Sequence, residues 1–120
     1  MRTPPTLTQF GKAVRKARID VGVTLGAMAA ALNVSSPYMN SIEKGKRFVS
    51  VLWVQRIEEF FRTQGHFIEL GALADVSNQR VSLEGLSLEQ QYLIARLAHT
   101  PLSEAQIAPF ERLLQKIKEQ

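Results

Sequence analysis

The chain has 120 residues, of which 45% are hydrophobic, and a formal net charge of +4. This length fits one domain, or one small domain with an extension. Because the chain has no cysteine, disulfides and thiolate metal sites are excluded. No segment is long and apolar enough to span a bilayer, and no apolar signal stretch follows the first residues. We therefore expect a cytoplasmic protein with no membrane partner.

The charge is distributed unevenly along the chain. Residues 1–65 contain ten Lys or Arg against four acidic residues, whereas residues 66–120 contain five against seven. A positive first half suits a polyanion such as nucleic acid. A basic surface that only maintains solubility explains the charge equally well.

The residue pattern is helical almost throughout, which predicts an all-α fold. Thr6 and Gln9 have the spacing of a capping box at the start of a first helix. Phe10 and Val14 follow at helical spacing, and Gly22 is expected to end the helix as its C-cap.

A second helix is predicted to begin at Thr24, its N-cap. Its inner side consists of small and medium apolar residues, namely Leu25, Met28, Ala29 and Leu32. Asn33 tolerates the left-handed conformation that a tight turn between two helices requires, and Val34 is the apolar residue of that turn.

A third helix is predicted over residues 36–44, capped by Ser35 or Ser36. Pro37 falls in its first turn, where a missing N–H group costs little. Two apolar side chains face inward and leave a polar outer side; they are Met39 and Ile42.

Two more helices are expected before residue 75. Ser50 caps a fourth helix, whose apolar stripe is Val51, Val54, Ile57, Phe60 and Phe61, and Trp53 lies beside the stripe. Residues 66–74 are expected to form a fifth helix that packs Phe67, Leu70 and Leu73 against the core.

The remaining residues are interpreted as a linker and an extension. Residues 1–75 form the first unit, residues 76–86 a turn-rich linker that includes a short strand-like alternation, and residues 87–120 a two-helix extension. The spacings Ser87-x-x-Gln90 and Ser103-x-x-Gln106 are capping boxes. Pro109 should kink or restart the last helix.

The first 65 residues resemble the Cro/cI-type (XRE) helix-turn-helix family. The resemblance depends on Ala29, on the turn at residues 33–35, and on the run over residues 38–46, whose Ile-Glu-x-Gly-Lys part is the most specific. It implies a five-helix lambda-repressor-like DNA-binding domain with a C-terminal two-helix extension. The chain departs from the family pattern at Leu25, where a phosphate-contacting Gln is common, and at Phe48, where a Pro is common.

The resemblance implies that the third helix contacts base edges in the DNA major groove. The positions concerned are Ser36, Pro37, Tyr38, Asn40 and Ser41. Asn40 is the best candidate for direct readout, because its amide can pair with adenine through one donor and one acceptor. No Arg occupies this outer side, so shape readout or dimerisation should supply much of the affinity.

Candidate phosphate contacts surround this helix, and they are Thr24, Lys44, Lys46, Arg47 and Arg15. The resemblance also implies that an Arg of the first helix, Arg15 or Arg18, pairs internally with Glu43.

Apolar stripes in the extension predict a homodimer that reads an inverted repeat, with half-sites about 34 Å apart. The residues concerned are Leu93, Leu97, Phe110, Leu113, Leu114 and Ile117. Alternatively, these side chains only complete the core of a monomer.

Three functions follow as hypotheses. The first is a sequence-specific transcriptional repressor, and the second is an antitoxin that binds DNA with its first half and a protein toxin with its extension. The third, a protein adaptor without DNA binding, is disfavoured by the basic residues 44–47. His66 and His99 lack the neighbours of a metal or catalytic site, so neither an enzyme nor a cofactor is expected.

Overall fold

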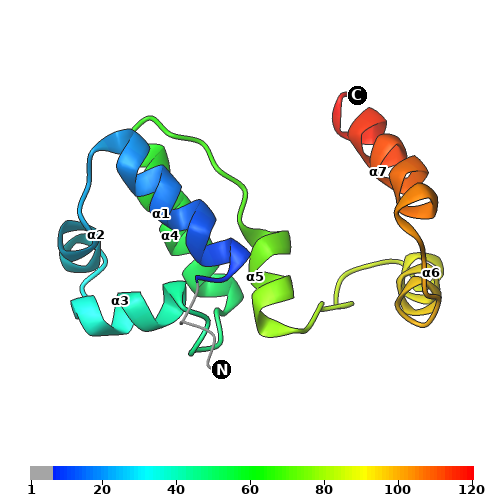
Figure 1. Ribbon diagram of the computed structural model, residues 1–120, viewed down its shortest axis with the longest axis horizontal. Coiled ribbons are helices and arrows are strands. Elements are labelled where there is room, and N and C mark those ends of the chain that lie inside the picture. The colour runs from blue at the N-terminus through cyan, green and yellow to red at the C-terminus, as the bar shows by residue number, and fades with distance from the viewer. Residues whose placement is uncertain (1–6) are drawn as a thin grey trace, which may run out of the picture. The chain divides into compact units, whose positions relative to one another are not determined.

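The computed structural model describes residues 7–120, which form seven helices and no strand, so the predicted all-α class is confirmed. The helices are α1 (Gln9–Val21), α2 (Leu25–Ala31), α3 (Ser36–Glu43), α4 (Val51–Thr63), α5 (Gly71–Asn78), α6 (Leu88–Ala98) and α7 (Glu104–Lys118). The chain divides into two compact units, one that ends at Val81 and one from Ser82 to Gln120. The first unit contains α1 to α5 and the second contains α6 and α7 (Figure 1).

Side-chain caps define where most helices begin. At every described helix except α5, whose N-cap is Leu70, a hydroxyl at the N-cap accepts a hydrogen bond from the backbone N–H three residues later. This bond satisfies one of the free donors of the first turn. Five of these caps were predicted and are confirmed, namely Thr24, Ser35, Ser50, Ser87 and Ser103. At Ser103 the capping box with Gln106 is complete, whereas at Ser87 only the bond from the Gln90 N–H is present, so the capping box predicted there is wrong.

The start of α1 differs from the prediction. Thr8 is the N-cap, and its hydroxyl accepts from the Gly11 N–H at 3.0 Å. Gln9 is therefore the first helical residue and not the third residue after a cap, as a capping box would require. Thr6 lies outside the described residues. Gly22 ends α1 with a φ of 73°, as predicted.

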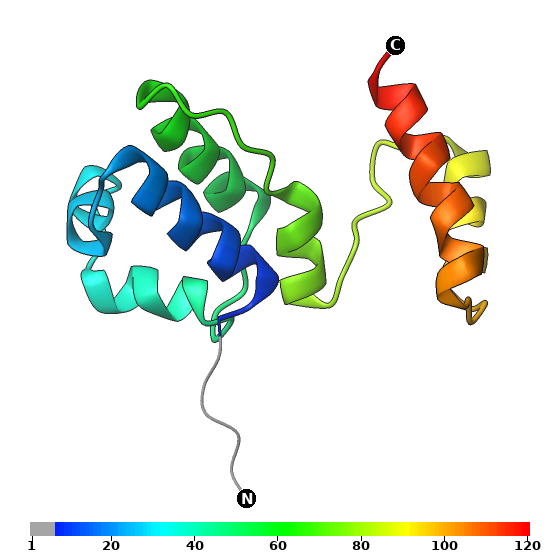
Figure 2. The ribbon, with the colours of Figure 1, turned by 45° about the horizontal axis from the view of Figure 1, so that its top comes forward.

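The first unit surrounds one apolar core. Helices α1 and α4 lie side by side in both views, and α2 is seen end-on while α3 lies in the plane, so α2 and α3 cross steeply (Figures 1 and 2). The largest fully buried side chains come from α1 to α4, from the loop after α3 and from the residue before α5, and they are Phe10, Val14, Met28, Met39, Ile42, Val49, Ile57, Phe61 and Leu70.

Helix α1 approaches the end of α3 so closely that only glycine fits at residue 11. A Cβ atom on Gly11 would lie 1.9 Å from the backbone carbonyl oxygen of Glu43. The Thr8 hydroxyl donates to that same oxygen at 3.3 Å. The contact fixes the C-terminal end of α3 on the core.

The connection between α2 and α3 has the predicted geometry. Asn33 has a φ of 61°, which Asn tolerates better than most residues. The Val34 N–H donates to the Ala29 carbonyl at 2.9 Å and closes the turn. Leu32 is buried, and Val34 is half-buried against the core.

Two expectations about α4 and α5 are wrong. Val51 and Phe67 are exposed at 69% and 80%, although both were assigned to buried stripes. The fifth helix occupies Gly71–Asn78 and not residues 66–74. An extended segment follows Gly65 and brings Leu70 into the core, where the Leu70 N–H donates to Glu58 Oε2 at 2.8 Å.

Helix α5 runs through Asn78, past the predicted start of the linker, and residues 80–84 form no strand.

In the second unit, α7 continues through Pro109 as one helix, so the chain does not restart there. No residue between 82 and 120 is buried. Within residues 7–120, no helix is both long enough and apolar enough to cross a bilayer.

Candidate nucleic-acid interface

Helix α3 is fixed to the core by one side and leaves its other side available. Met39 and Ile42 are fully buried, as predicted. Ser35 caps the helix through the Tyr38 N–H at 3.2 Å, and Pro37 lies in the first turn. The helix is thus anchored at its start and along its inner side, which makes its outer side rigid.

The predicted base-contacting residues lie on this helix with different degrees of exposure. Ser36 and Pro37 are exposed, whereas Tyr38, Asn40 and Ser41 are half-buried. The Ser41 hydroxyl donates to the Tyr38 carbonyl at 2.6 Å, so its proton is already used within the helix. Ser41 therefore keeps mainly an acceptor for a ligand.

Arg47 and Trp53 contact the ring of Tyr38, and Arg56 in turn contacts Trp53. The Tyr38 and Trp53 rings lie 5.7 Å apart at 49°, and the Arg47 guanidinium lies 4.9 Å from the Tyr38 ring centre. The Arg56 guanidinium lies 4.5 Å from the Trp53 ring centre. Cation–π contacts of this kind orient both partners. The sequence interpretation treated Trp53 only as a core residue and gave Arg56 no role.

Glu43, at the end of α3, is the one charged residue that is buried in the described chain, at 2% exposure. Arg18 Nε donates to Glu43 Oε2 and Arg18 Nη2 donates to Oε1, both at 3.1 Å. The expected pairing with an arginine of the first helix is thus confirmed, and Arg18 is the partner. Arg15 is exposed, which leaves it available to an external anion.

The other predicted phosphate contacts lie at the two ends of the α2–α3 pair. Lys46 and Arg47 are exposed in the loop after α3, and Lys44 is half-buried as the C-cap of α3. Thr24 is exposed, and its hydroxyl already accepts from the Ala27 N–H at 3.0 Å. Its oxygen can still donate a proton outward.

The loop after α3 is held by the C-terminal end of α5. Asn78 Oδ1 accepts from the Val49 N–H at 2.8 Å, and Asn78 Nδ2 donates to the Val49 carbonyl at 2.7 Å. Gly45 has a φ of 72° and packs beside Thr8 and Ser77. No local pattern predicts this pair of hydrogen bonds, because Val49 and Asn78 are 29 positions apart in the chain.

A pocket of about 320 Å³ lies between this loop and α5, and Arg80 is part of it. Its lining consists of Gly45, Lys46, Arg47, Phe48, Ser77, Asn78 and Arg80. The lining contains three cationic residues and no acidic one. Arg80 was missed from the sequence, where it belongs to the segment interpreted as a linker.

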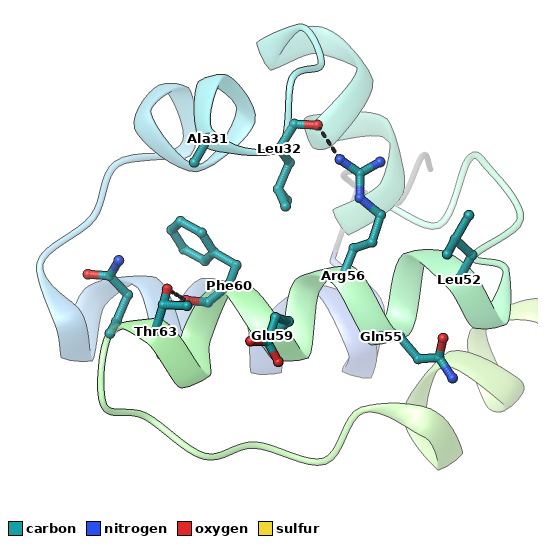
Figure 3. Close-up of a pocket in the computed structure, with 9 residues that line it drawn as sticks. Ala31, Leu32, Leu52, Gln55, Arg56, Glu59, Phe60 and Thr63 are labelled. Atoms are coloured by element: carbon teal, nitrogen blue, oxygen red, sulfur yellow. Dashed lines mark hydrogen bonds between the residues drawn. The ribbon is translucent and has the colours of Figure 1, made fainter.

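A second concavity, of about 650 Å³, lies between the end of α2 and α4 and is open to solvent (Figure 3). Phe60 forms one wall, and Arg56 reaches across to donate from Nη2 to the Leu32 carbonyl at 2.8 Å. This bond satisfies a carbonyl at the end of α2. Arg56 therefore connects α4 to the turn that precedes α3.

The predicted dimerisation residues lie on α6 and α7. Leu97 is half-buried, whereas the other large apolar side chains of the set are 42–64% exposed, namely Leu93, Phe110, Leu113, Leu114 and Ile117.

In the described chain, no three His, Cys, Asp or Glu side chains are placed to hold a metal ion.

No protein-family model, curated protein or solved structure matches this chain.

Proposed function

We propose that the chain is a sequence-specific regulator of transcription that binds double-stranded DNA and represses its own gene as a dimer. In this proposal α1 to α5 form a lambda-repressor-like domain of the Cro/cI type, and α3 enters the major groove. The observation that carries the proposal is the construction of α3. Its inner side is buried, its outer side is polar, and basic Lys46 and Arg47 follow at its end.

Asn40 is assigned the main base contact. No described side chain or backbone group hydrogen-bonds to its amide, so both a donor and an acceptor remain for an adenine edge. Tyr38 and Pro37 offer apolar contact to a thymine methyl group. Ser36 and Ser41 contribute less discrimination, because a hydroxyl bonds equally to a base or to a phosphate.

The charge distribution supports the choice of DNA as partner. Lys44, Lys46 and Arg47 lie together at the end of α3, and Arg15 is exposed on α1. Glu43, the nearest carboxylate in sequence, is neutralised by Arg18 and buried. The loop therefore presents positive charge that is suited to the phosphate backbone.

A second copy of this chain is proposed to cover α6 and α7. No residue of this unit is buried, yet it carries a series of half-exposed leucine, isoleucine and aromatic side chains. Two such helices bury too little surface to be stable alone. Pairing with a second copy would bury the apolar stripes of both copies against each other. A twofold dimer also supplies the two reading helices that an inverted repeat requires.

The same uncovered stripes favour a second candidate function. If a protein toxin and not a copy of this chain occupies α6 and α7, the chain is an antitoxin whose first unit still binds DNA. Sedimentation of the purified chain distinguishes the two candidates. A dimer without any second protein favours the repressor, and a monomer favours the antitoxin.

Fluorescence anisotropy with the duplex upstream of the chain's own gene tests the proposal. We expect tight binding to this duplex and much weaker binding to a shuffled duplex of the same length, with affinity that falls as salt rises. Equal and weak binding to both duplexes would reject a sequence-specific regulator.

A further inference from the structure

We propose that Lys46, Arg47 and Arg80 form a pocket that binds a single phosphate group of the DNA backbone. This inference depends on the proposed function and adds to it a contact from α5, outside the α2–α3 pair. The pocket lies between the loop after α3 and the C-terminal end of α5.

The composition of the pocket selects an anion. Its three charged residues are all cationic, and a volume of about 320 Å³ accommodates a phosphate group with its first waters. Two guanidinium groups and one ammonium group match the oxygens of a phosphate, which accepts several charge-assisted hydrogen bonds at once. An anion placed among these three exposed cations is attracted by all of them, and no acidic residue of the lining opposes it.

The fold fixes the position of Arg80. Gln79, the C-cap of α5, has a φ of 57°, and the Arg80 N–H donates to the Asp75 carbonyl at 3.0 Å. This left-handed end turns the chain back, and the Arg80 guanidinium lies 5.9 Å from the centre of the Phe48 ring. Arg80 thus joins the lining from the end of α5, whereas Lys46 and Arg47 belong to the loop after α3.

The other wall is fixed as well. Asn78 holds the backbone of Val49 by two hydrogen bonds, so the loop cannot move independently of α5. On the α5 side of the pocket, the Ser77 hydroxyl is buried and has no hydrogen-bond partner in the described residues. An unsatisfied buried hydroxyl beside a cationic pocket is consistent with a site that is completed by a ligand.

Arg47 connects the pocket to the proposed reading helix. It lines the pocket and also stacks on Tyr38 of α3. A phosphate in the pocket therefore lies beside the outer side of α3, where a backbone contact fixes the register of the helix on the duplex.

The test compares Arg80→Ala with Arg62→Ala, which removes an equal charge at the far end of α4. A mixed-sequence duplex of about 30 base pairs is the probe, because a phosphate contact does not depend on sequence. Binding is measured by anisotropy as a function of salt, and melting temperatures verify that both variants fold.

We expect Arg80→Ala to lower the affinity and to reduce the slope of log affinity against log salt by about one, with Arg62→Ala unchanged and Arg80→Lys close to wild type. If wild type binds duplex and Arg80→Ala binds with the same slope and affinity, the pocket is overturned while the proposed function stands. If no variant binds duplex, the proposed function fails. A third outcome is that inorganic phosphate raises the melting temperature of wild type but not of Arg80→Ala, while neither binds duplex. This result would assign the pocket to free phosphate and overturn the DNA contact.

Discussion

Arg18 binds both carboxylate oxygens of Glu43 and so joins the last turn of α1 to the last residue of α3. The Arg18 side chain is 11% exposed and the Glu43 side chain is 3% exposed. A buried pair of this kind fixes the orientation of α3 relative to α1. The same interface contains Gly11, whose missing side chain admits the Glu43 carbonyl.

Arg18→Ala should lower the free energy of unfolding by about 3–5 kcal/mol, because it leaves the Glu43 carboxylate buried without a cation. Chemical denaturation measures the change. Arg15→Ala is the matched control, since Arg15 is exposed on the same helix, and it should leave stability nearly unchanged.

The double variant Arg18→Met/Glu43→Leu removes both charges and retains most of the volume. We expect it to be more stable than Arg18→Ala, because no charge then remains buried. Additive losses in a double-mutant cycle would show that the two side chains do not interact.

Gly11→Ala should lower stability by about 1–3 kcal/mol, because the new methyl group meets the backbone of Glu43 and α1 must shift. Gly26→Ala is the control at the start of α2, where the Cβ meets only the Ser36 hydroxyl at 3.6 Å. It should raise stability by about 0.5–1 kcal/mol through helix propensity. Similar melting temperatures for the two variants would argue against the close packing of α1 on α3.

Adjacent residues of α5 should respond differently to alanine. Asn78→Ala removes two hydrogen bonds from the buried Val49 backbone and should cost about 1–3 kcal/mol. Ser77→Ala removes a buried hydroxyl without a partner and should leave the stability of the DNA-free protein unchanged or slightly raised. A large loss in Ser77→Ala would mean that this hydroxyl is bonded in the free protein.

Leu114→Glu should weaken self-association at least about tenfold, since it places a charge in the apolar stripe of α7. Gln115→Glu introduces the same residue and the same charge change on the neighbouring polar side, and it should dimerise like wild type. Sedimentation equilibrium measures both, and a monomeric wild-type chain would contradict the dimer.

Local signals in the sequence were enough to place most helix ends. Ser50 and Thr24 cap their helices because a hydroxyl satisfies a free N–H within three residues, which needs no tertiary partner. Asn33 was predictable for the same reason, since its left-handed φ depends on its own side chain.

Helix periodicity alone failed at residues 66–74. Phe67, Leu70 and Leu73 have helical spacing, but a non-helical segment before Gly71 still places Leu70 in the core and leaves Phe67 in solvent, and Leu73 packs on the core from α5. In this arrangement the Leu70 N–H donates to Glu58, a contact between two different segments of the chain that helix periodicity does not contain.

The candidate site was predictable only where it depends on local sequence patterns and not on tertiary contacts. The residues of α3 follow from its own amphipathic pattern, whereas Arg80 and Asn78 meet the loop after α3 only once the chain has folded. The stacking of Tyr38 on Trp53 likewise depends on how α3 and α4 cross, which no local pattern encodes.

Footprinting on the DNA upstream of the chain's own gene tests most directly whether α3 reads bases. Wild type should protect a palindromic segment, and Gln55→Ala, which removes an exposed amide from α4, should protect it equally. Asn40→Ala should need at least about fivefold more protein for the same protection, because it loses a bidentate base contact. Undiminished protection by an Asn40→Ala/Ser41→Ala variant, or no protection by wild type at low salt, would contradict the account.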